Sequence, residues 1–151
     1  MRISARIEGV ERLKGYLDAL ADRAREPLVT ELQKSAILVH EEAVKSIQAH
    51  RSSGIQYGKH TASKPGFPPN SDTGKGASSI EWEIDPSIPA SAVGTNLDYM
   101  VGLEFGHTRT TKTGKVAVVE ARPWLAPAYK KHKRTILFNL RKALAEAFRR
   151  K

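Results

Sequence analysis

The chain has 151 residues, carries a formal net charge of +9 and contains no cysteine. Disulfide scaffolds, thiolate metal sites and cysteine nucleophiles are therefore excluded, and this length is typical of one domain. No stretch reaches the ~18 consecutive apolar residues of a membrane span, and the first residues lack the apolar core of a secretory signal. We therefore expect a single domain over residues 1–151 that does not enter a membrane.

The positive charge is concentrated near the C-terminus. Residues 129–151 hold nine lysines and arginines and one acid, a net charge of +8, which leaves +1 for the other 128 residues. This predicts a nearly neutral domain with a basic last helix. Such a helix meets nucleic acid, an acidic protein surface or only solvent, and all three interpretations stay open here.

The N-terminal third predicts a short strand and two helices. Alternating apolar residues over 1–8 favour the strand, and apolar residues then recur every three or four positions from Val10. Pro27 predicts a break between a first helix and a second one over residues 28–49. The predicted apolar stripes are Val10, Leu13, Leu17, Leu20 and Ala24 in the first helix, and Leu28, Leu32, Ser35, Ala36, Val39, Ala43 and Ile47 in the second.

Residues 50–76 are polar, rich in proline and glycine, and without periodicity. A loop of this length is unusual inside a compact domain. We expect residues 50–71 to form an extended arm that is mobile in the free subunit. Asp72-Thr73-Gly74 then predicts the cap of a short helical turn through Ala77.

The second half predicts a hairpin, a short helix, a further strand and a long helix. Residues 79–85 and 90–95 read as antiparallel strands joined by a turn at 86–89, with Ile80, Trp82 and Ile84 opposite Glu81, Glu83 and Asp85. Residues 99–105 predict a helix that packs Tyr99, Leu103 and Phe105 inward. Residues 108–115 predict a polar excursion, 116–119 a strand, and 124–150 the basic C-terminal helix. The stripe of that helix is Leu125, Ala128, His132, Ile136, Leu140, Ala143, Leu144 and Ala147.

Together these elements predict an α+β fold: a small, mainly antiparallel sheet packed against two long helices, with a long mobile loop. Reaction chemistry is not apparent. There is no nucleophile elbow and no phosphate-binding glycine loop, and no two histidines stand four apart. Glu104 and His107 are three apart but lack a third ligand, which favours a polar cluster at a helix end. We expect no catalytic residue, no metal and no cofactor.

Several short motifs follow one another in a characteristic order. They are Asp72-Thr73-Gly74, Ser78-Ser79-Ile80, Val93-Gly94-Thr95, then Tyr99 with Glu104-Phe105-Gly106, and finally Ala121-Arg122-Pro123-Trp124-Leu125-Ala126-Pro127-Ala128. Over residues 30–150 this order resembles the neck proteins of tailed phages, the head–tail joining or tail-completion proteins of siphophage type. The chain departs from the family pattern at His107, where threonine is frequent, and at Trp124, where phenylalanine is commoner.

The resemblance implies a structural protein of the virion, made in the bacterial cytoplasm and placed in the neck or tail. It implies a ring, expected to be a hexamer, that joins the capsid connector to the tail near the packaged DNA, in a tail-completion, tail-terminator or head–tail joining role. In physical terms, Gly106 can end the short helix with a positive φ, and Pro123 suits a helix start. The expected structural anchors are Tyr99, Phe105, Gly106, Pro123, Trp124 and Leu125; the expected interface residues are Arg109, Lys112, Lys115, Lys130, Lys131, Arg134 and Arg141.

Two other functions remain open on the sequence. The basic last helix can bind DNA or RNA, although no base-reading motif accompanies it. Glu81, Glu83 and Asp85 share one face of a predicted strand, as in some metal-dependent nucleases, although such a row more often lies against solvent or an interface. Their carboxylates would be about 7 Å apart in successive steps, given the rise of a strand.

Overall fold

The computed structural model describes residues 9–49, 54–111 and 113–149 and has the predicted α+β architecture. The predicted strand over residues 1–8 lies outside this part of the chain. In chain order the elements are α1 Val10–Gln48, β1 Gln56–Tyr57, β2 His60–Thr61, α2 Lys75–Ser78, β3 Ile80–Asp85, β4 Ala90–Thr95, α3 Asp98–Phe105, β5 His107–Thr110, β6 Val116–Val119 and α4 Leu125–Arg149. No helix in these ranges is both long and apolar enough to cross a membrane.

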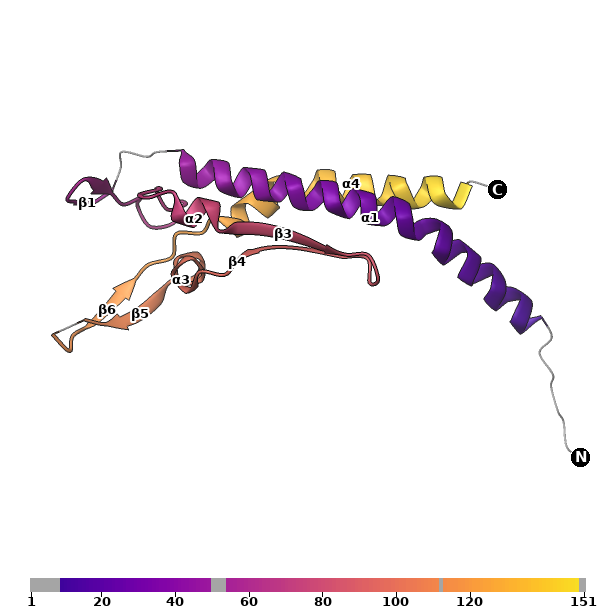
Figure 1. Ribbon diagram of the computed structural model, residues 1–151, viewed down its shortest axis with the longest axis horizontal. Helices are drawn as coiled ribbons and strands as arrows, with labels where there is room; N and C mark the ends of the chain where they lie inside the picture. The colour runs from indigo at the N-terminus through magenta and orange to yellow at the C-terminus, as the bar shows by residue number, and fades with distance from the viewer. Residues whose placement is uncertain (1–8, 50–53, 112, 150–151) are drawn as a thin grey trace, which may run out of the picture.

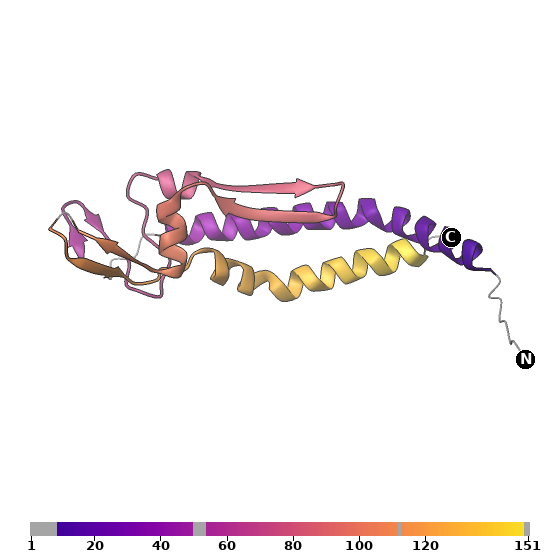
Figure 2. The same cartoon turned by 90° about the horizontal axis from the view of Figure 1, so that it is seen from below.

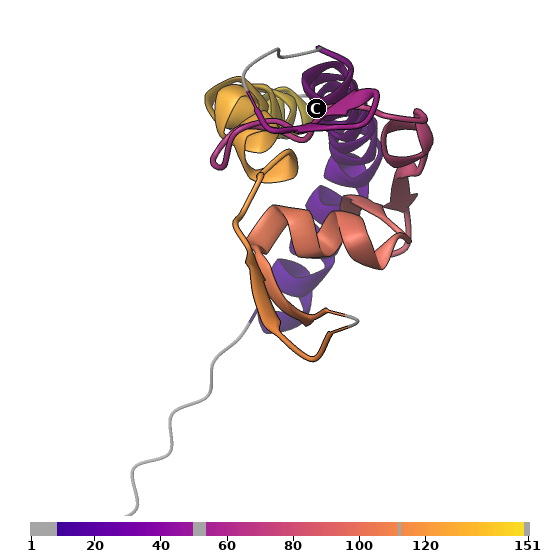
Figure 3. The ribbon, with the colours of Figure 1, turned by 90° about the vertical axis from the view of Figure 1, so that its left-hand side faces the viewer.

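The molecule is elongated along α1 (Figure 1). Helix α4 runs antiparallel to α1 on one flank, and the β3–β4 hairpin lies along the other flank (Figure 2). The end-on view shows the same three layers, with α1 between α4 and the hairpin (Figure 3). The small elements α2, α3, β1–β2 and β5–β6 gather at the C-terminal end of α1.

Helix α1 is one continuous helix where two were predicted, and Pro27 lies inside it. A proline removes one helical hydrogen bond and bends a helix, but does not end it where packing holds both sides. Here α4 supplies that packing, since Ala143 and Ala147 line one cavity together with Pro27 and Thr30. The N-terminal part of α1 bends away from the rest (Figure 1).

The core forms where α1, α4 and the hairpin meet. Val39, Ala43 and Ile47 of α1 are buried there, which confirms the stripe predicted for residues 28–49. The stripe of α4 is confirmed by the burial of Ala128, Ile136, Ala143 and Ala147. Of the stripe predicted for the first helix, Ala24 is buried, but Val10, Leu13 and Leu17 are 54%, 59% and 54% exposed. That segment projects beyond α4, where no other described element packs against it (Figure 2).

Within the described residues the strands form three separate two-stranded antiparallel sheets, where a single small sheet was predicted. The predicted β3–β4 hairpin is confirmed, with Trp82 opposite Val93 and Glu83 opposite Ala92. Strand β6, however, pairs with β5, so the first three residues of the predicted polar excursion, 108–110, belong to a strand. The short α3 helix separates the two hairpins along the chain and keeps β6 away from β4.

The described part of the 50–71 segment is more regular than the sequence indicated. Residues 56–61 form the β1–β2 hairpin, and two backbone hydrogen bonds tie the rest to the body. Gly66 N donates to Ala121 O at 2.8 Å, and Ser71 N donates to Ile47 O at 3.2 Å. Residues 50–53 lie outside the described ranges, and the mobility of the arm stays a prediction.

Candidate functional site

The motif region, by which we mean residues 99–128 with the last two motifs, is organised around one buried carboxylate, that of Glu104. Its Oε2 accepts hydrogen bonds from Trp124 N at 2.7 Å and Leu125 N at 2.9 Å, and its Oε1 accepts one from Ala126 N at 2.9 Å. Glu104 is only 8% exposed. The first N–H groups of a helix have no partner within the helix, and the helix dipole favours an anion there. Glu104 of α3 therefore caps α4 from twenty residues away.

Further contacts fix α3 against the start of α4, and we call this contact region the α3–α4 junction (Met100, Leu103, Glu104, Arg122 and Trp124). Trp124 is 2% exposed, and its indole Nε1 donates to Met100 O at 3.0 Å. Arg122 N donates to Leu103 O at 2.6 Å. The Glu104 carboxylate, the Trp124 indole and the Arg122 backbone N–H each have hydrogen-bond partners in this region, so the junction holds the start of α4 in place.

Gly106 ends α3 in a conformation that favours glycine. Its φ is +74°, and a Cβ there would lie 3.0 Å from both Ala121 N and Val119 O. A side chain would therefore push α3 away from the chain that leads into α4. The predicted role of Gly106 is confirmed.

The other predicted anchors divide into two groups. Trp124 is buried and Leu125 packs against the core, as expected. Pro123 lies two residues before α4 begins, not in its first turn. The inward packing predicted for α3 is confirmed for Leu103, which packs against the core, but is wrong for Tyr99 and Phe105, which are 48% and 78% exposed.

Met100 and Glu104 occupy the inner face of α3 in their place. They stand four residues apart and so lie on one face of the helix. A hydrophobicity pattern cannot find this face, because one of its two members is a carboxylate that backbone donors satisfy. The only sequence signal was an acid inside an apolar helix, upstream of a proline-marked helix start.

Lys131, an expected interface residue, belongs to a clamp between the two long helices, which we call the Glu42 clamp (Glu42, Lys131 and His132). Lys131 Nζ lies 2.7 Å from Glu42 Oε1, and His132 Nε2 lies 3.5 Å from Glu42 Oε2. The hydrogen bond from Lys131 is the main cause that holds the pKa of Glu42 below its ordinary value of 4.5, with His132 adding to it and desolvation opposing it. Lys131 therefore helps to hold α4 on α1.

The remaining interface candidates that the structure describes form no ion pair with another described residue. Arg109 and Lys115 are exposed on the β5–β6 hairpin, and Lys112 lies outside the described ranges. Lys130, Arg134 and Arg141 are exposed along α4. These three residues form a basic surface on α4, on the flank of the molecule opposite the β3–β4 hairpin.

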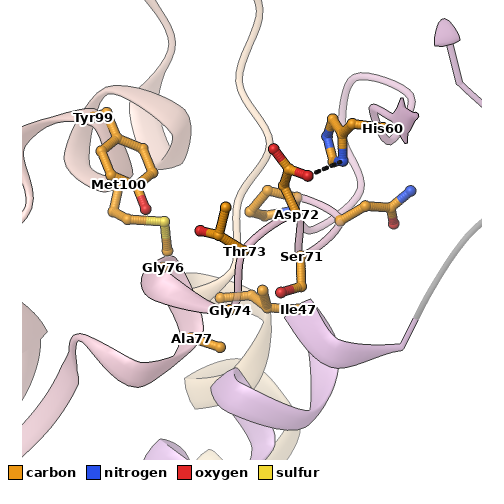
Figure 4. A pocket seen from close by; sticks show the side chains of 12 residues that line it. Ile47, His60, Ser71, Asp72, Thr73, Gly74, Gly76, Ala77, Tyr99 and Met100 are labelled. Atoms are coloured by element: carbon orange, nitrogen blue, oxygen red, sulfur yellow. Dashed lines mark ion pairs between the residues drawn. The ribbon is translucent and has the colours of Figure 1, made fainter. Parts of the chain in front are cut away.

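A polar pocket of about 170 Å³ lies between α2, α3 and the loop before α2 (Figure 4). His60 Nδ1 and Asp72 Oδ1 lie 3.8 Å apart at one side of it (Figure 4). The predicted cap at Asp72-Thr73-Gly74 is confirmed in its last residue, because Gly74 is the N-cap of α2, with a φ of +81°. Gly76 also lines the pocket, and a Cβ at this position would lie 2.9 Å from Met100 Sδ.

The described residues contain no group of three side chains that could hold a metal ion. Glu104 and His107 do not share a ligand position, since Glu104 faces α4 while His107 Nδ1 lies 3.1 Å from Gly102 O. Glu81, Glu83 and Asp85 are exposed along the outer face of β3. Asp85 is occupied by its own turn, where bonds from Ser87 and Ile88 lower its pKa.

Comparisons with protein-family models, with curated proteins and with solved structures found no match.

Proposed function

We propose that the protein is a structural joining subunit of the neck of a tailed phage or prophage, working as a ring between the capsid connector and the tail. The observation that supports this most is the α3–α4 junction. The last two motifs of the resemblance fix the direction of α4, because Glu104 and Trp124 hold its start through hydrogen bonds. A motif that positions a helix suits a protein whose function is to present surfaces.

The extent of the surface also supports assembly. The chain exposes 11492 Å², whereas a compact monomer of 16.7 kDa would expose about 7,600 Å². The fifteen residues outside the described ranges would account for at most about 2,400 Å² even if fully extended. The excess is typical of a subunit that buries surface on its neighbours.

Exposed apolar side chains indicate where neighbours would bind. Phe105, Val116 and Val118 are each more than 70% exposed at the α3 end, and Phe138 is 66% exposed on α4. Closed rings need two different patches on each subunit, one for each neighbour. By the resemblance, the partners would be other copies in a hexamer, the adjoining neck and tail-tube or connector proteins, and packaged DNA nearby.

A deletion in the phage or prophage that encodes the protein tests the proposal. We expect filled heads and finished tails that remain separate, with joining restored by the wild-type chain supplied in trans. Intact virions after deletion would overturn the proposal. The expected location is the virion neck, so a subunit-resolved virion map with six copies there supports the hexamer, and one with twelve contradicts it.

A second candidate function is nucleic-acid binding by α4. The exposed Lys130, Lys133, Arg134 and Arg141 support it, because their charges are available to phosphates. A salt titration of DNA binding decides: neutralising several phosphates gives a log–log slope of about −0.9 for each one. Absence of binding at low salt ends this alternative.

A further inference from the structure

The two flanks of α1 carry opposite charge. Exposed acids lie along the outer face of β3, and exposed lysines and arginines lie along α4. The flanks face away from each other, with α1 between them (Figure 3). They therefore cannot meet within one molecule, but the acidic flank of one copy can meet the basic flank of another.

Each flank also has a shape that suits the other. On α4, Phe138 is 66% exposed and stands between basic residues at positions −4, +3 and +4, namely Arg134, Arg141 and Lys142. On the hairpin, a shallow depression of about 200 Å³ lies between Glu81 and Glu83 and is lined by the small residues Ala92 and Gly94. An exposed aromatic side chain with cationic neighbours on one flank thus has, on the other flank, a depression with anionic neighbours.

The two features lie at the same height along α1. Lys131 marks the level of Glu42 on α4, and Ile80 O marks the level of His40 on β3, where it lies 3.0 Å from His40 Nε2. From these points both elements run toward the N-terminal part of α1, because Arg25 Nη1 donates to Pro86 O and Ala147 lies beside Pro27.

The rises of a helix and a strand then give the heights above the level of Glu42. Phe138 stands at about 10 Å and Trp82, in the middle of the depression, also at about 10 Å. Arg134 stands at about 5 Å against about 6 Å for Glu81. Arg141 stands at about 15 Å against about 13 Å for Glu83.

We propose that copies of this chain associate side by side through this contact: Phe138 of one copy enters the depression between Glu81 and Glu83 of the next, with Arg134 facing Glu81 and Arg141 facing Glu83. Because the heights match, the neighbour is displaced sideways with little shift along α1. Repeating such a heterologous contact closes a ring when each step also rotates the subunit by a fixed fraction of a turn, and a large shift along α1 would instead give a filament. The inference deepens the proposed function and rests on it for the closing of the ring.

The main test uses two exposed phenylalanines on the same helix. Light scattering after size exclusion is measured for the wild type, Phe138→Ser and the control Phe148→Ser, which is 53% exposed but lies about 15 Å farther along α4. We expect wild type and Phe148→Ser to self-associate alike. Loss of a central aromatic anchor should weaken the association of Phe138→Ser by at least about thirtyfold. Circular dichroism checks that all three are equally folded.

A charge exchange tests the register. Glu83→Arg and Arg141→Glu should each weaken self-association, and the double variant should restore it, because the exchanged pair attracts again. Failure of the double variant to recover, while wild type associates, overturns the register.

The outcomes separate this contact from the proposed function. A wild type that remains a monomer at the highest concentration overturns the contact, since both surfaces are already present on each copy. An oligomer that Phe138→Ser leaves intact also overturns the contact, and the ring would then form through another surface. Association that appears only when DNA is added overturns it in favour of nucleic-acid binding. The deletion phenotype in the phage is unaffected by any of these results.

Discussion

At the scale of single residues, Glu104 replaces the usual local cap of a helix with a distant one. Most helices take their cap from the residue just before them, which keeps the cap and the helix together along the chain. Here three donors of α4 depend on a carboxylate from α3. The start of α4 and the position of α3 are therefore stabilised by the same contact.

Glu104→Ala should lower the free energy of unfolding by about 2–4 kcal/mol, because it leaves buried donors without an acceptor. Glu104→Gln keeps one acceptor oxygen and should cause a smaller loss. Urea unfolding followed by circular dichroism measures both, with the exposed Glu120→Ala as the control. A Glu104→Ala variant as stable as the control would contradict the capping role.

Phe105 and Trp124 should differ sharply although both belong to the motif region. Phe105→Ala removes a side chain that is 78% exposed and should change the free energy of unfolding by less than about 0.5 kcal/mol. Trp124→Ala empties a buried position and should cost about 3–5 kcal/mol. Thermal unfolding of both variants checks this, and similar melting temperatures would count against the orientation of α3.

At the scale of elements, periodicity predicted what lies within one segment and missed what lies between segments. The stripes of α4 and of residues 28–49, and the β3–β4 hairpin, follow from local spacing. The continuity of α1 through Pro27 depends on packing by α4, far along the chain. The inner face of α3 depends on backbone donors near residue 124. Neither partner is visible in the local pattern.

The two halves of the α1 stripe look alike in sequence but should contribute differently to stability. Leu17 is 54% exposed and Ile47 is 2% exposed. Leu17→Ala should change the free energy of unfolding by less than about 0.5 kcal/mol, and Ile47→Ala should lower it by about 2–5 kcal/mol. Denaturant unfolding of the two variants provides the comparison. An equal loss would show that the projecting part of α1 is covered in solution.

The Glu42 clamp should make the packing of α4 on α1 sensitive to acid. The pKa of Glu42 is lowered in the folded protein, so its contribution is present above about 4.5 and is lost as the pH falls through the folded value. At pH 7, Glu42→Gln should be less stable than wild type by about 1 kcal/mol, and at pH 3 the difference should be smaller. Unfolding at both pH values measures this. A constant difference would mean that the charge of Glu42 is not the cause.

At the scale of the whole molecule, the basic charge of α4 serves two purposes that position along the helix separates. Lys131 faces α1 and pairs with Glu42, while Arg134 is on the exposed side. Charge that faces inward stabilises the fold, and charge that faces outward is available to a neighbour or to DNA. The net charge of the helix does not distinguish these roles.

Neutralising one cation of each kind should separate folding from binding. Lys131→Gln should lower the free energy of unfolding by about 0.5–1 kcal/mol and leave self-association unchanged. Arg134→Gln should leave stability within about 0.5 kcal/mol but weaken self-association, and it should do so less at high salt, where screening already weakens the wild-type contact. If α4 instead binds DNA, Arg134→Gln should reduce the slope of log affinity against log salt by about one. Unfolding, light scattering and DNA titration on the same two variants therefore distinguish a ring contact from a nucleic-acid contact. A ring contact predicts that Arg134→Gln, and not Lys131→Gln, changes self-association. A nucleic-acid contact predicts that Arg134→Gln, and not Lys131→Gln, changes DNA binding.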